Sequence, residues 1–444
     1  MTTYYLIIGN GAAGVSAAEV IRRRDPTGRI TIITDEPYPM YSRPGIAYYL
    51  LGQVSDTQLY TRTPSFYRDH RFDLRTSRVT RLDIPRQTAT LTDGQQLGYD
   101  VALLATGSTA VPATFPGGDL DGVVTFDTLD DAKNVLRRAR RARQAVVVGG
   151  GITAMELAEG LHHQGVRTHF LQRKDRIWPR LFDERESAIV AAQIRHEGIH
   201  LHFQEEVAEV IGRRGKVAGV RLQNGPELKC QLVGVAIGVR PNLALVRDQP
   251  VEQDRGVLVN LYLQSSQPTL FAAGSVAQVY DRWTDSYQVD SLWPSAINEG
   301  RAAGYNMVDV ARGLPPSYAY EKGTPFNAAL LFGLHLTVIG RVGGSLRDGE
   351  GETLSYLSRG SSQVWTMPFE EQVRSAWDQK GPNSVRVVLN GGRIVGALLL
   401  GNQALADPLR HLIEHEVDIS PLAGELMAGR FDALIEVANT SPSS

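Results

Sequence analysis

The stretch "YYLIIGNGAAGVSAAEVIRRR", Tyr4–Arg24, indicates how the chain begins to fold. An apolar run ends in Gly9, Gly11 and Gly14, spaced as G-x-G-x-x-G, and a helical pattern follows. In a dinucleotide-binding unit, the first glycine permits the tight turn and the second lets the backbone approach a pyrophosphate. The third lets helix and strand pack closely. The stretch therefore predicts a strand, a glycine turn and a helix whose N-terminus faces a dinucleotide.

A second apolar strand follows and ends in two acids, Asp35 and Glu36, a little over twenty residues after the glycines. An acid at this place can accept a hydrogen bond from a ribose hydroxyl. A lone glycine motif is weak evidence, but strand, turn, helix, strand and acid occur here in the right order.

A second copy of the pattern, "QAVVVGGGITAMELAEGLHHQGVRTHFLQRKD", begins at Gln144. Gly149 and Gly151 occupy the first two glycine positions, and Ala154 occupies the third. Two copies in one chain argue against glycine turns that bind nothing. They predict one flavin site and one nicotinamide site.

The second copy lacks the acid, and its second strand ends in Gln172, Arg173 and Lys174. A carboxylate there would favour NADH and repel a 2′-phosphate, whereas glutamine with neighbouring cations removes that repulsion and can hold the phosphate. The two cations are equally consistent with ordinary surface charges. The pattern leans towards NADPH and leaves NADH open.

Length and composition limit the function classes. The 444 residues suggest two or three domains, and a net charge of −2 gives no sign of nucleic-acid binding. The single cysteine, Cys230, excludes a thiol pair within this chain, and its apolar, strand-like surroundings predict a buried residue. We expect no metal site, because the histidines form no ligand-like grouping with carboxylates. With no signal peptide and no apolar run of about 18 residues, we expect a cytoplasmic protein without a membrane span.

Four later segments complete a family pattern: "LLATGS" (103–108), "AIGVRPN" (236–242), "VNLYLQSSQPTLFAAGSVAQ" (259–278) and "WPSAINEGRAAGYNM" (293–307). With the two glycine motifs, they resemble the two-dinucleotide-binding-domain flavoprotein reductases of the pyridine nucleotide–disulfide oxidoreductase fold. The resemblance implies an α/β fold with two Rossmann-like domains, for FAD and NAD(P), and a C-terminal α+β interface domain.

The resemblance also implies domain boundaries. We expect an FAD-binding domain over 1–111 and 251–321, an NAD(P)-binding domain over 112–250 and an interface domain over 322–444. In the last of these, alternating apolar residues and a hairpin around Asn390 predict a sheet. In relatives this domain covers the flavin or forms dimer and partner contacts, so a homodimer or a hetero-oligomer is possible.

The stretch "PMYSRPGIAYYLLG" (39–52) is most similar to the cysteine-free branch of the family. That branch includes ferredoxin, rubredoxin and putidaredoxin reductases and the flavin portion of NAD(P)H-dependent nitrite reductases. The match implies that Arg43 reaches the FAD and that Asp35 binds its ribose. Without a thiol, the flavin itself is expected to pass electrons on to oxygen, a quinone-like acceptor or an iron–sulfur partner.

Two positions depart from the family pattern. Many ferredoxin-reductase relatives carry a lysine where this chain has Tyr48, paired with a glutamate that is kept here as Glu156. We therefore expect Glu156 either to find another donor, such as the hydroxyl of Tyr48 or Tyr49, or to have a raised pKa and be protonated. Ser275 stands where the family has an aspartate aimed at the ribityl chain, which predicts weaker FAD binding.

The expected function is an FAD-dependent NAD(P)H oxidoreductase that passes electrons to an iron–sulfur protein or subunit. A peroxide-forming NAD(P)H oxidase and a flavin-holding structural subunit of a larger redox complex are the alternatives. Glu156 is the candidate catalytic residue. The residues expected to contact FAD are Gly9, Gly11, Ala12, Ala13, Gly14, Asp35, Glu36, Arg43, Ala105, Thr106, Gly107, Gly274 and Ser275. Those expected to contact the nicotinamide coenzyme are Gly149, Gly151, Ile152, Arg173 and Gly238.

Overall fold

The computed structural model describes the whole chain except residues 1, 344–373, 381–382, 429 and 441–444. Its chain divides into two compact units. The first comprises Met1–Ala110, Asp127–Leu129 and Val239–Lys322, and the second comprises Val111–Phe126, Asp130–Gly238 and Gly323–Ser444. The residues expected to contact FAD lie in the first unit, and those expected to contact the coenzyme lie in the second. The three-domain boundaries given above stay a prediction.

The first unit is built on a five-stranded parallel sheet of order β19-β7-β1-β2-β3. Its strands are β1 (Tyr4–Ile8), β2 (Arg29–Thr34), β3 (Phe72–Thr76), β7 (Val101–Leu104) and β19 (Leu270–Ala272). The central strands are almost wholly apolar and buried, as expected for a parallel sheet covered on both faces. Smaller elements surround this sheet. They are α2 (Ile46–Leu50), η1 (Thr57–Leu59), α3 (Pro64–Asp69), β4 (Val79–Asp83), β5 (Thr88–Leu91), β6 (Gln96–Gly98), β18 (Val257–Leu258), β20 (Ala277–Asp281) and β21 (Ser286–Gln288).

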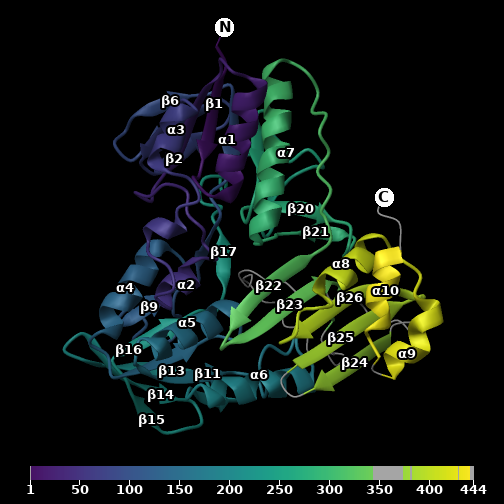
Figure 1. Cartoon of the computed structure of the whole chain (residues 1–444). Helices are drawn as coiled ribbons and strands as arrows, with labels where there is room; N and C mark the ends of the chain where they lie inside the picture. Colours follow the sequence, from purple (N-terminus) through teal and green to yellow (C-terminus); the bar gives the residue numbers. More distant parts are fainter. Residues whose placement is uncertain (1, 344–373, 381–382, 429, 441–444) are drawn as a thin grey trace. The chain divides into compact units, whose positions relative to one another are not determined.

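Two helices far apart in the sequence pack side by side in this unit: α1 (Ala12–Arg24) and α7 (Trp293–Ala311) (Figure 1). A Cβ atom on Gly300 would lie 2.1 Å from the Ala13 carbonyl oxygen, and one on Gly304 would lie 2.7 Å from the Ala17 carbonyl oxygen. Glycine is therefore needed at both places for the helices to approach this closely. The late helix α7 fixes the helix that carries the first glycine turn.

The chain leaves and re-enters the first unit through paired strands. β8 (Ser108–Ala110) and β17 (Val239–Pro241) are antiparallel neighbours. β8 begins at the last residue of the "LLATGS" segment, and β17 lies within the "AIGVRPN" segment.

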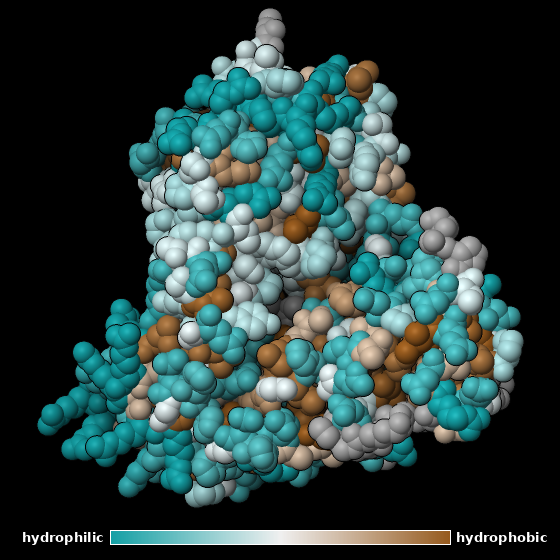
Figure 2. All heavy atoms as spheres, viewed as in Figure 1, coloured by the Kyte–Doolittle hydropathy of each residue, from teal (hydrophilic) through white to brown (hydrophobic). Residues whose placement is uncertain are grey.

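The second unit contains another five-stranded parallel sheet, of order β12-β11-β10-β16-β9. Its strands are β9 (Val123–Thr125), β10 (Gln144–Val148), β11 (Arg167–Gln172), β12 (His200–Phe203) and β16 (Leu232–Val235). The helices in this part of the chain are α4 (Leu129–Ala139), α5 (Ile152–His163) and α6 (Glu184–His196). An antiparallel sheet is added by β13 (Val207–Arg213), β14 (Lys216–Leu222) and β15 (Glu227–Lys229). Figure 2 shows hydrophilic side chains projecting from the corner where Figure 1 places β14 and β15, as expected for a solvated edge.

The C-terminal part of this unit is an antiparallel sheet of order β22-β23-β26-β25-β24. Its strands are β22 (Phe326–Leu331), β23 (Leu334–Gly340), β24 (Arg374–Lys380), β25 (Asn383–Asn390) and β26 (Arg393–Leu400). The helical segments α8 (Ala406–Glu414), η3 (Ser420–Leu422), α9 (Ala423–Met427) and α10 (Ala433–Thr440) follow. The hairpin predicted around Asn390 is confirmed, because Gly391 and Gly392, with φ of 56° and 81°, join β25 to β26.

A buried ion pair links this C-terminal sheet to α6 within the second unit. Arg386 on β25 donates from Nε to Glu186 Oε1 at 2.8 Å and from a terminal nitrogen to Glu186 Oε2 at 3.1 Å. The two side chains are 3% and 0% exposed. The same guanidinium donates to the carbonyl oxygens of Leu181 and Gly343. Glu186 also completes the capping box of α6 with Asp183, so one carboxylate serves both helix and sheet.

The predicted fold class is confirmed, with one local correction. Cys230 does not lie in a strand but in the short link between β15 and β16, where its side chain is fully buried. In the part of the chain that the structure describes, no helix is long and apolar enough to cross a membrane.

Candidate functional site

The first glycine turn has the shape that a dinucleotide site requires. Gly9 has φ of +123°, and a Cβ there would lie 2.0 Å from the Ala105 carbonyl oxygen. A Cβ on Gly14 would lie 2.1 Å from the Gly9 carbonyl oxygen. Gly11 is the N-cap of α1, and the space around its absent side chain is empty within 4 Å. The turn therefore packs tightly on the protein side and is open at Gly11, where a pyrophosphate can approach the helix N-terminus.

The two acids after β2, Asp35 and Glu36, have different surroundings. Asp35 is exposed and forms an ion pair with Arg78 at 2.8 Å. Glu36 is partly buried, pairs with Arg43 and accepts a hydrogen bond from the Tyr41 hydroxyl at 2.5 Å. Burial first, and then the negative charge of Glu36, raises the pKa of Tyr41. Only Glu36 thus joins the cluster around Arg43. As the candidate ribose ligand, it has a better-fixed position than Asp35.

Arg43 lies between two acids of the first unit. Besides Glu36, it contacts Asp127, with its Nη1 3.1 Å from the main-chain carbonyl oxygen and 3.5 Å from Oδ1. Asp127 is 2% exposed and accepts the Ala110 N–H through its other carboxylate oxygen at 2.9 Å. Asp127 was not predicted from the sequence, because it belongs to no motif and lies 84 residues from Arg43.

The end of β7 is held by another long-range partner. The Asn242 side chain donates to the Thr106 carbonyl oxygen at 2.8 Å, and the Thr106 hydroxyl donates to the Asn242 carbonyl oxygen at 3.2 Å. The Asn242 N–H donates to the carbonyl oxygen of Gly107, which has φ of +63°. The "AIGVRPN" motif contains Asn242, so the sequence offered a signal for this residue that the predicted site did not use.

Another turn follows β19 and lies next to the first glycine turn, at the start of α1. Gly274 has φ of +76°, and a Cβ there would lie 3.2 Å from Ala13 Cβ. Its N–H donates to Glu299 Oε2 at 2.7 Å, while the neighbouring Ser275 is partly buried. The turns after β1, β2, β7 and β19 all leave the carboxyl ends of parallel strands, so they meet at one edge of the sheet.

These residues fit FAD. The glycine turn leaves open backbone where a phosphate belongs, and acidic and hydroxyl side chains gather at the same sheet edge. One carboxyl oxygen there, Oε1 of Glu299, has no hydrogen-bond partner among the described residues. The residue-by-residue assignment stays a proposal.

The second glycine turn repeats this geometry in the second unit. Gly149 has φ of +148°, and a Cβ there would lie 2.2 Å from the Ala236 carbonyl oxygen. Gly151 is the N-cap of α5, which begins at Ile152, and Ala154 is fully buried at the third motif position. Gly238, with φ of +127°, follows β16 beside this turn. The arrangement fits a nicotinamide dinucleotide at the carboxyl edge of this second parallel sheet.

At the end of β11, Gln172 and the two cations that follow it have different roles, although the sequence suggested one phosphate contact for all three. Gln172 is 3% exposed, and its side-chain amide donates to the Gly149 carbonyl oxygen at 2.7 Å. It therefore supports the glycine turn and is not placed to bind a 2′-phosphate. Arg173 and Lys174 are exposed after the strand, so the cations alone are candidates for that contact.

Glu156, one turn into α5, lies near another carboxyl group. Its poorly hydrated surroundings raise its pKa to about 8, with a further contribution from Glu159. Burial also raises the pKa of Glu159 to about 7, although its Oε1 accepts the Phe332 N–H at 2.8 Å. The direction expected for Glu156 from the sequence agrees with this result. At neutral pH the group holds its proton.

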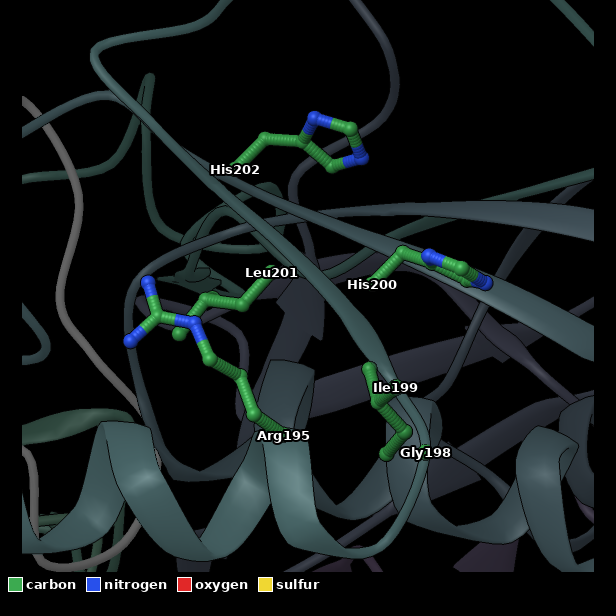
Figure 3. A pocket seen from close by; sticks show the side chains of 6 residues that line it. All are labelled: Arg195, Gly198, Ile199, His200, Leu201 and His202. Atoms are coloured by element: carbon green, nitrogen blue, oxygen red, sulfur yellow. The ribbon is translucent and has the colours of Figure 1, made fainter.

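A hollow of about 370 Å³ lies at the edge of the parallel sheet of the second unit, around β12 and the end of α6 (Figure 3). It is lined by Arg195, Gly198, Ile199, His200, Leu201 and His202, none of which is a predicted site residue. Next to it, His169 Nδ1 lies 3.0 Å from His202 Nε2, and burial lowers the pKa of His169 to about 4. Burial also lowers the pKa of His202, so His169 and His202 are both neutral at pH 7. No metal-binding group of three or more ligands occurs within the described ranges.

Comparisons with known proteins agree with this geometry. The model of a family described as pyridine nucleotide-disulphide oxidoreductase matches residues 3–300. The nitrite reductase [NAD(P)H] of Bacillus subtilis is 26% identical over 424 residues, which are 94% of this chain and 48% of that protein. This chain therefore spans about half the length of that relative. A rubredoxin-NAD(+) reductase of Pseudomonas putida is 27% identical over 274 residues, which are 61% of this chain and 71% of that protein.

A solved structure shows the same fold. The crystal structure of a ferredoxin reductase from Rhodopseudomonas palustris matches with a TM-score of 0.82 and 22% identity, and the match covers 98% of this chain and 100% of that one. The predictions of an enzyme, of FAD and of NAD(P)H are confirmed at the level of the family. The chain belongs to the pyridine nucleotide-disulphide oxidoreductase family.

Proposed function

We propose that this chain passes electrons from NAD(P)H through FAD to an iron–sulfur protein or subunit, without a redox-active cysteine. The observation that carries the proposal is the state of the single thiol. Cys230 is fully buried in the link between β15 and β16, and burial raises its pKa to about 12. The thiolate is the reactive form of cysteine, so this residue is inert at neutral pH. Within this chain, electrons have no dithiol to pass through.

The residues of the first unit bind and orient the cofactor. The Gly9–Gly14 turn offers backbone N–H groups to the pyrophosphate, and Glu36 offers a carboxylate to a ribose. Arg43 keeps a cation beside that carboxylate, and Ser275 offers its hydroxyl from the opposite turn. FAD, when bound, accepts a hydride from the nicotinamide and can release the electrons singly, which matches a one-electron acceptor.

The residues of the second unit bind the coenzyme and carry one proton. The turn at Gly149 and Gly151 holds the pyrophosphate of NAD(P)H at the N-terminus of α5. Glu156, protonated at neutral pH, adds no negative charge close to the coenzyme. We propose that it acts as a neutral hydrogen-bonding group there, which a glutamine can replace.

The relatives support an iron–sulfur acceptor. The Pseudomonas putida relative is named for rubredoxin and the Rhodopseudomonas palustris structure for ferredoxin. The nitrite reductase relative is about twice as long as this chain, which supports a partner domain or subunit as the acceptor. The boundaries of the FAD, NAD(P) and interface domains belong to the same proposal.

The test is anaerobic stopped-flow absorption of the FAD-loaded chain. NADPH or NADH is added first, and oxidised rubredoxin or a [2Fe–2S] ferredoxin is added second. We expect flavin absorbance to bleach with at least one coenzyme and to return faster with the iron–sulfur protein than with air-saturated buffer. Cys230→Ser serves as a control and is expected to behave as the parent chain does.

Two results contradict the proposal. Recovery of the flavin signal with oxygen but not with the iron–sulfur protein, accompanied by peroxide, would identify an oxidase. Bound flavin that neither coenzyme bleaches would identify a flavin-holding structural subunit.

A further inference from the structure

A cluster of buried charged side chains adjoins the turn at Gly274 in the first unit. It comprises three carboxyl groups and one ammonium group. Asp281, Asp290 and Glu299 are at most 1% exposed, and Lys322 is 4% exposed. Lys322 Nζ lies 2.9 Å from a carboxylate oxygen of Asp281 and 2.9 Å from one of Asp290. The two negative charges of Asp281 and Asp290 therefore already exceed the single positive charge of Lys322.

Both aspartates have further donors that favour their charged form. Asp290 accepts the Leu292 N–H at 2.8 Å and the Ser295 hydroxyl at 2.7 Å. Asp281 accepts the Trp283 N–H at 2.9 Å. Since hydrogen bonds to a carboxylate stabilise its ionised state, these two groups hold the negative charge of the cluster.

Glu299 differs from them in its partners. One oxygen, Oε2, accepts the Gly274 N–H, and the other has no hydrogen-bond partner among the described residues. Burial raises its pKa well above the ordinary value, and Asp290 raises it further, while the Gly274 N–H, Lys322 and the Tyr320 phenol each oppose this rise. A third ionised carboxyl would leave two uncompensated charges in the interior, so the neutral form is favoured.

The place of Glu299 connects this cluster to the cofactor site. The next residue on α7, Gly300, packs against the Ala13 carbonyl oxygen at the start of α1. α1 faces this contact with alanine, so it adds no titratable group beside Glu299. Gly274 packs against the Ala13 side chain from its own turn. The Glu299 carboxyl thus holds together the β19 turn and the helix pair that frames the first glycine motif.

We propose that Glu299 is a positioning residue for FAD, which as an uncharged acid accepts the Gly274 N–H and fixes the turn that presents Ser275. The inference rests on the proposed assignment of this turn to the FAD site. In this chain the turn carries a serine in place of a charged ligand. The shape of this turn therefore depends on the uncharged Glu299 carboxyl that accepts the Gly274 N–H. Ionisation of Glu299 is expected to weaken FAD binding.

The test compares Glu299→Gln, which keeps a neutral acceptor, with Glu299→Ala, which removes it. FAD is titrated into the apoprotein and followed by flavin fluorescence between pH 6 and 9. We expect Glu299→Gln to bind within about threefold of the parent at pH 6, and Glu299→Ala to bind at least about tenfold more weakly. The Kd of the parent rises with pH as the carboxyl ionises, while that of Glu299→Gln stays flat. Glu321→Gln, at an exposed neighbouring glutamate, is the matched control.

A stability measurement supplies a second readout. A carboxyl whose folded pKa is raised binds more protons when folded, so the parent loses stability as pH rises above about 4.5. The Tm of Glu299→Gln minus that of the parent should therefore grow from pH 5 to pH 8. This comparison needs only the glutamine variant and decides the question if Glu299→Ala does not fold.

Three results would overturn the inference. Glu299→Gln can bind FAD as weakly as Glu299→Ala, both variants can bind as the parent does, or the parent and Glu299→Gln can share one pH profile. Ser275→Ala separates the inference from the proposed function. If neither Ser275→Ala nor the Glu299 variants change FAD affinity while Gly9→Ala abolishes it, the turn lies outside the FAD site but the flavoenzyme remains.

Discussion

Replacing Arg386 with methionine should destabilise the second unit strongly. The guanidinium makes two hydrogen bonds to Glu186 and two to main-chain carbonyl oxygens, and both charged side chains are almost completely buried. Methionine fills much of the volume but leaves the Glu186 carboxylate without its counter-ion. Removing one partner of a buried ion pair costs about 3–5 kcal/mol. For a unit of this size, the loss corresponds to a Tm lower by roughly 6–20 °C.

The assay is urea unfolding followed by far-UV circular dichroism at pH 5 and at pH 8. In the variant, the raised pKa of Glu186 rises further because Arg386 no longer opposes the effect of burial. The folded state then binds more protons than the unfolded state, so stability falls as pH rises. The deficit of Arg386→Met relative to the parent should therefore be larger at pH 8 than at pH 5.

Two comparisons test this reasoning. Arg393→Met removes an exposed arginine on β26 of the same sheet, whose partner Glu416 lies in the turn after α8, and it should cost less than about 1 kcal/mol. Glu186→Gln combined with Arg386→Met should recover part of the loss, since no buried charge then remains unpaired. A cost for Arg386→Met no greater than that of Arg393→Met, or a deficit that does not change with pH, would refute the argument.

Three further substitutions have clear expected outcomes. Gly9→Ala would place a Cβ atom 2.0 Å from the Ala105 carbonyl oxygen at a positive φ, so FAD affinity in a fluorescence titration should fall by more than about tenfold; unchanged affinity would contradict the geometry of the turn. Glu156 has a pKa of about 8, so the rate of flavin reduction by NAD(P)H should change between pH 7 and 9 in the parent and stay flat in Glu156→Gln; the same pH profile in both would remove Glu156 from the site. Cys230→Ser should keep full electron transfer to ferricyanide, because the thiol is buried with a pKa of about 12, whereas a loss of turnover with an unchanged Tm would give the thiol a role.

Local patterns explain how much of the fold was predictable. A strand, a glycine turn and a helix are set within about twenty residues, so both nucleotide-binding motifs and the Asn390 hairpin could be recognised from neighbouring residues alone. The close contacts of these glycines are not local, because Gly9 packs against Ala105 and Gly149 packs against Ala236.

The remaining site residues depend on contacts that no local pattern records. Arg43 meets Asp127 across 84 residues, and Thr106 meets Asn242 across 136 residues. Gln172 looked like a candidate for the coenzyme phosphate because its position is the usual one for the acid. Only the folded chain shows that its amide is used by Gly149. Lys322 belongs to no recognised motif, and Glu299 lies in the "WPSAINEGRAAGYNM" segment without standing out there. The role of both depends on a buried charge balance that requires all four members of the cluster.

The contact between α1 and α7 has a consequence for how the protein is made. The first unit begins at the N-terminus, but its sheet is completed by β19 and its first helix is covered by α7. During synthesis, β1, β2, β3 and β7 can pair early, but the β19 neighbour of β7 and the α7 cover of α1 are complete only when about residue 311 has left the ribosome. The second parallel sheet, whose strands all lie between residues 123 and 235, can form in the meantime. The chain therefore completes its inserted sheet first, and its first residues are among the last to reach their final surroundings.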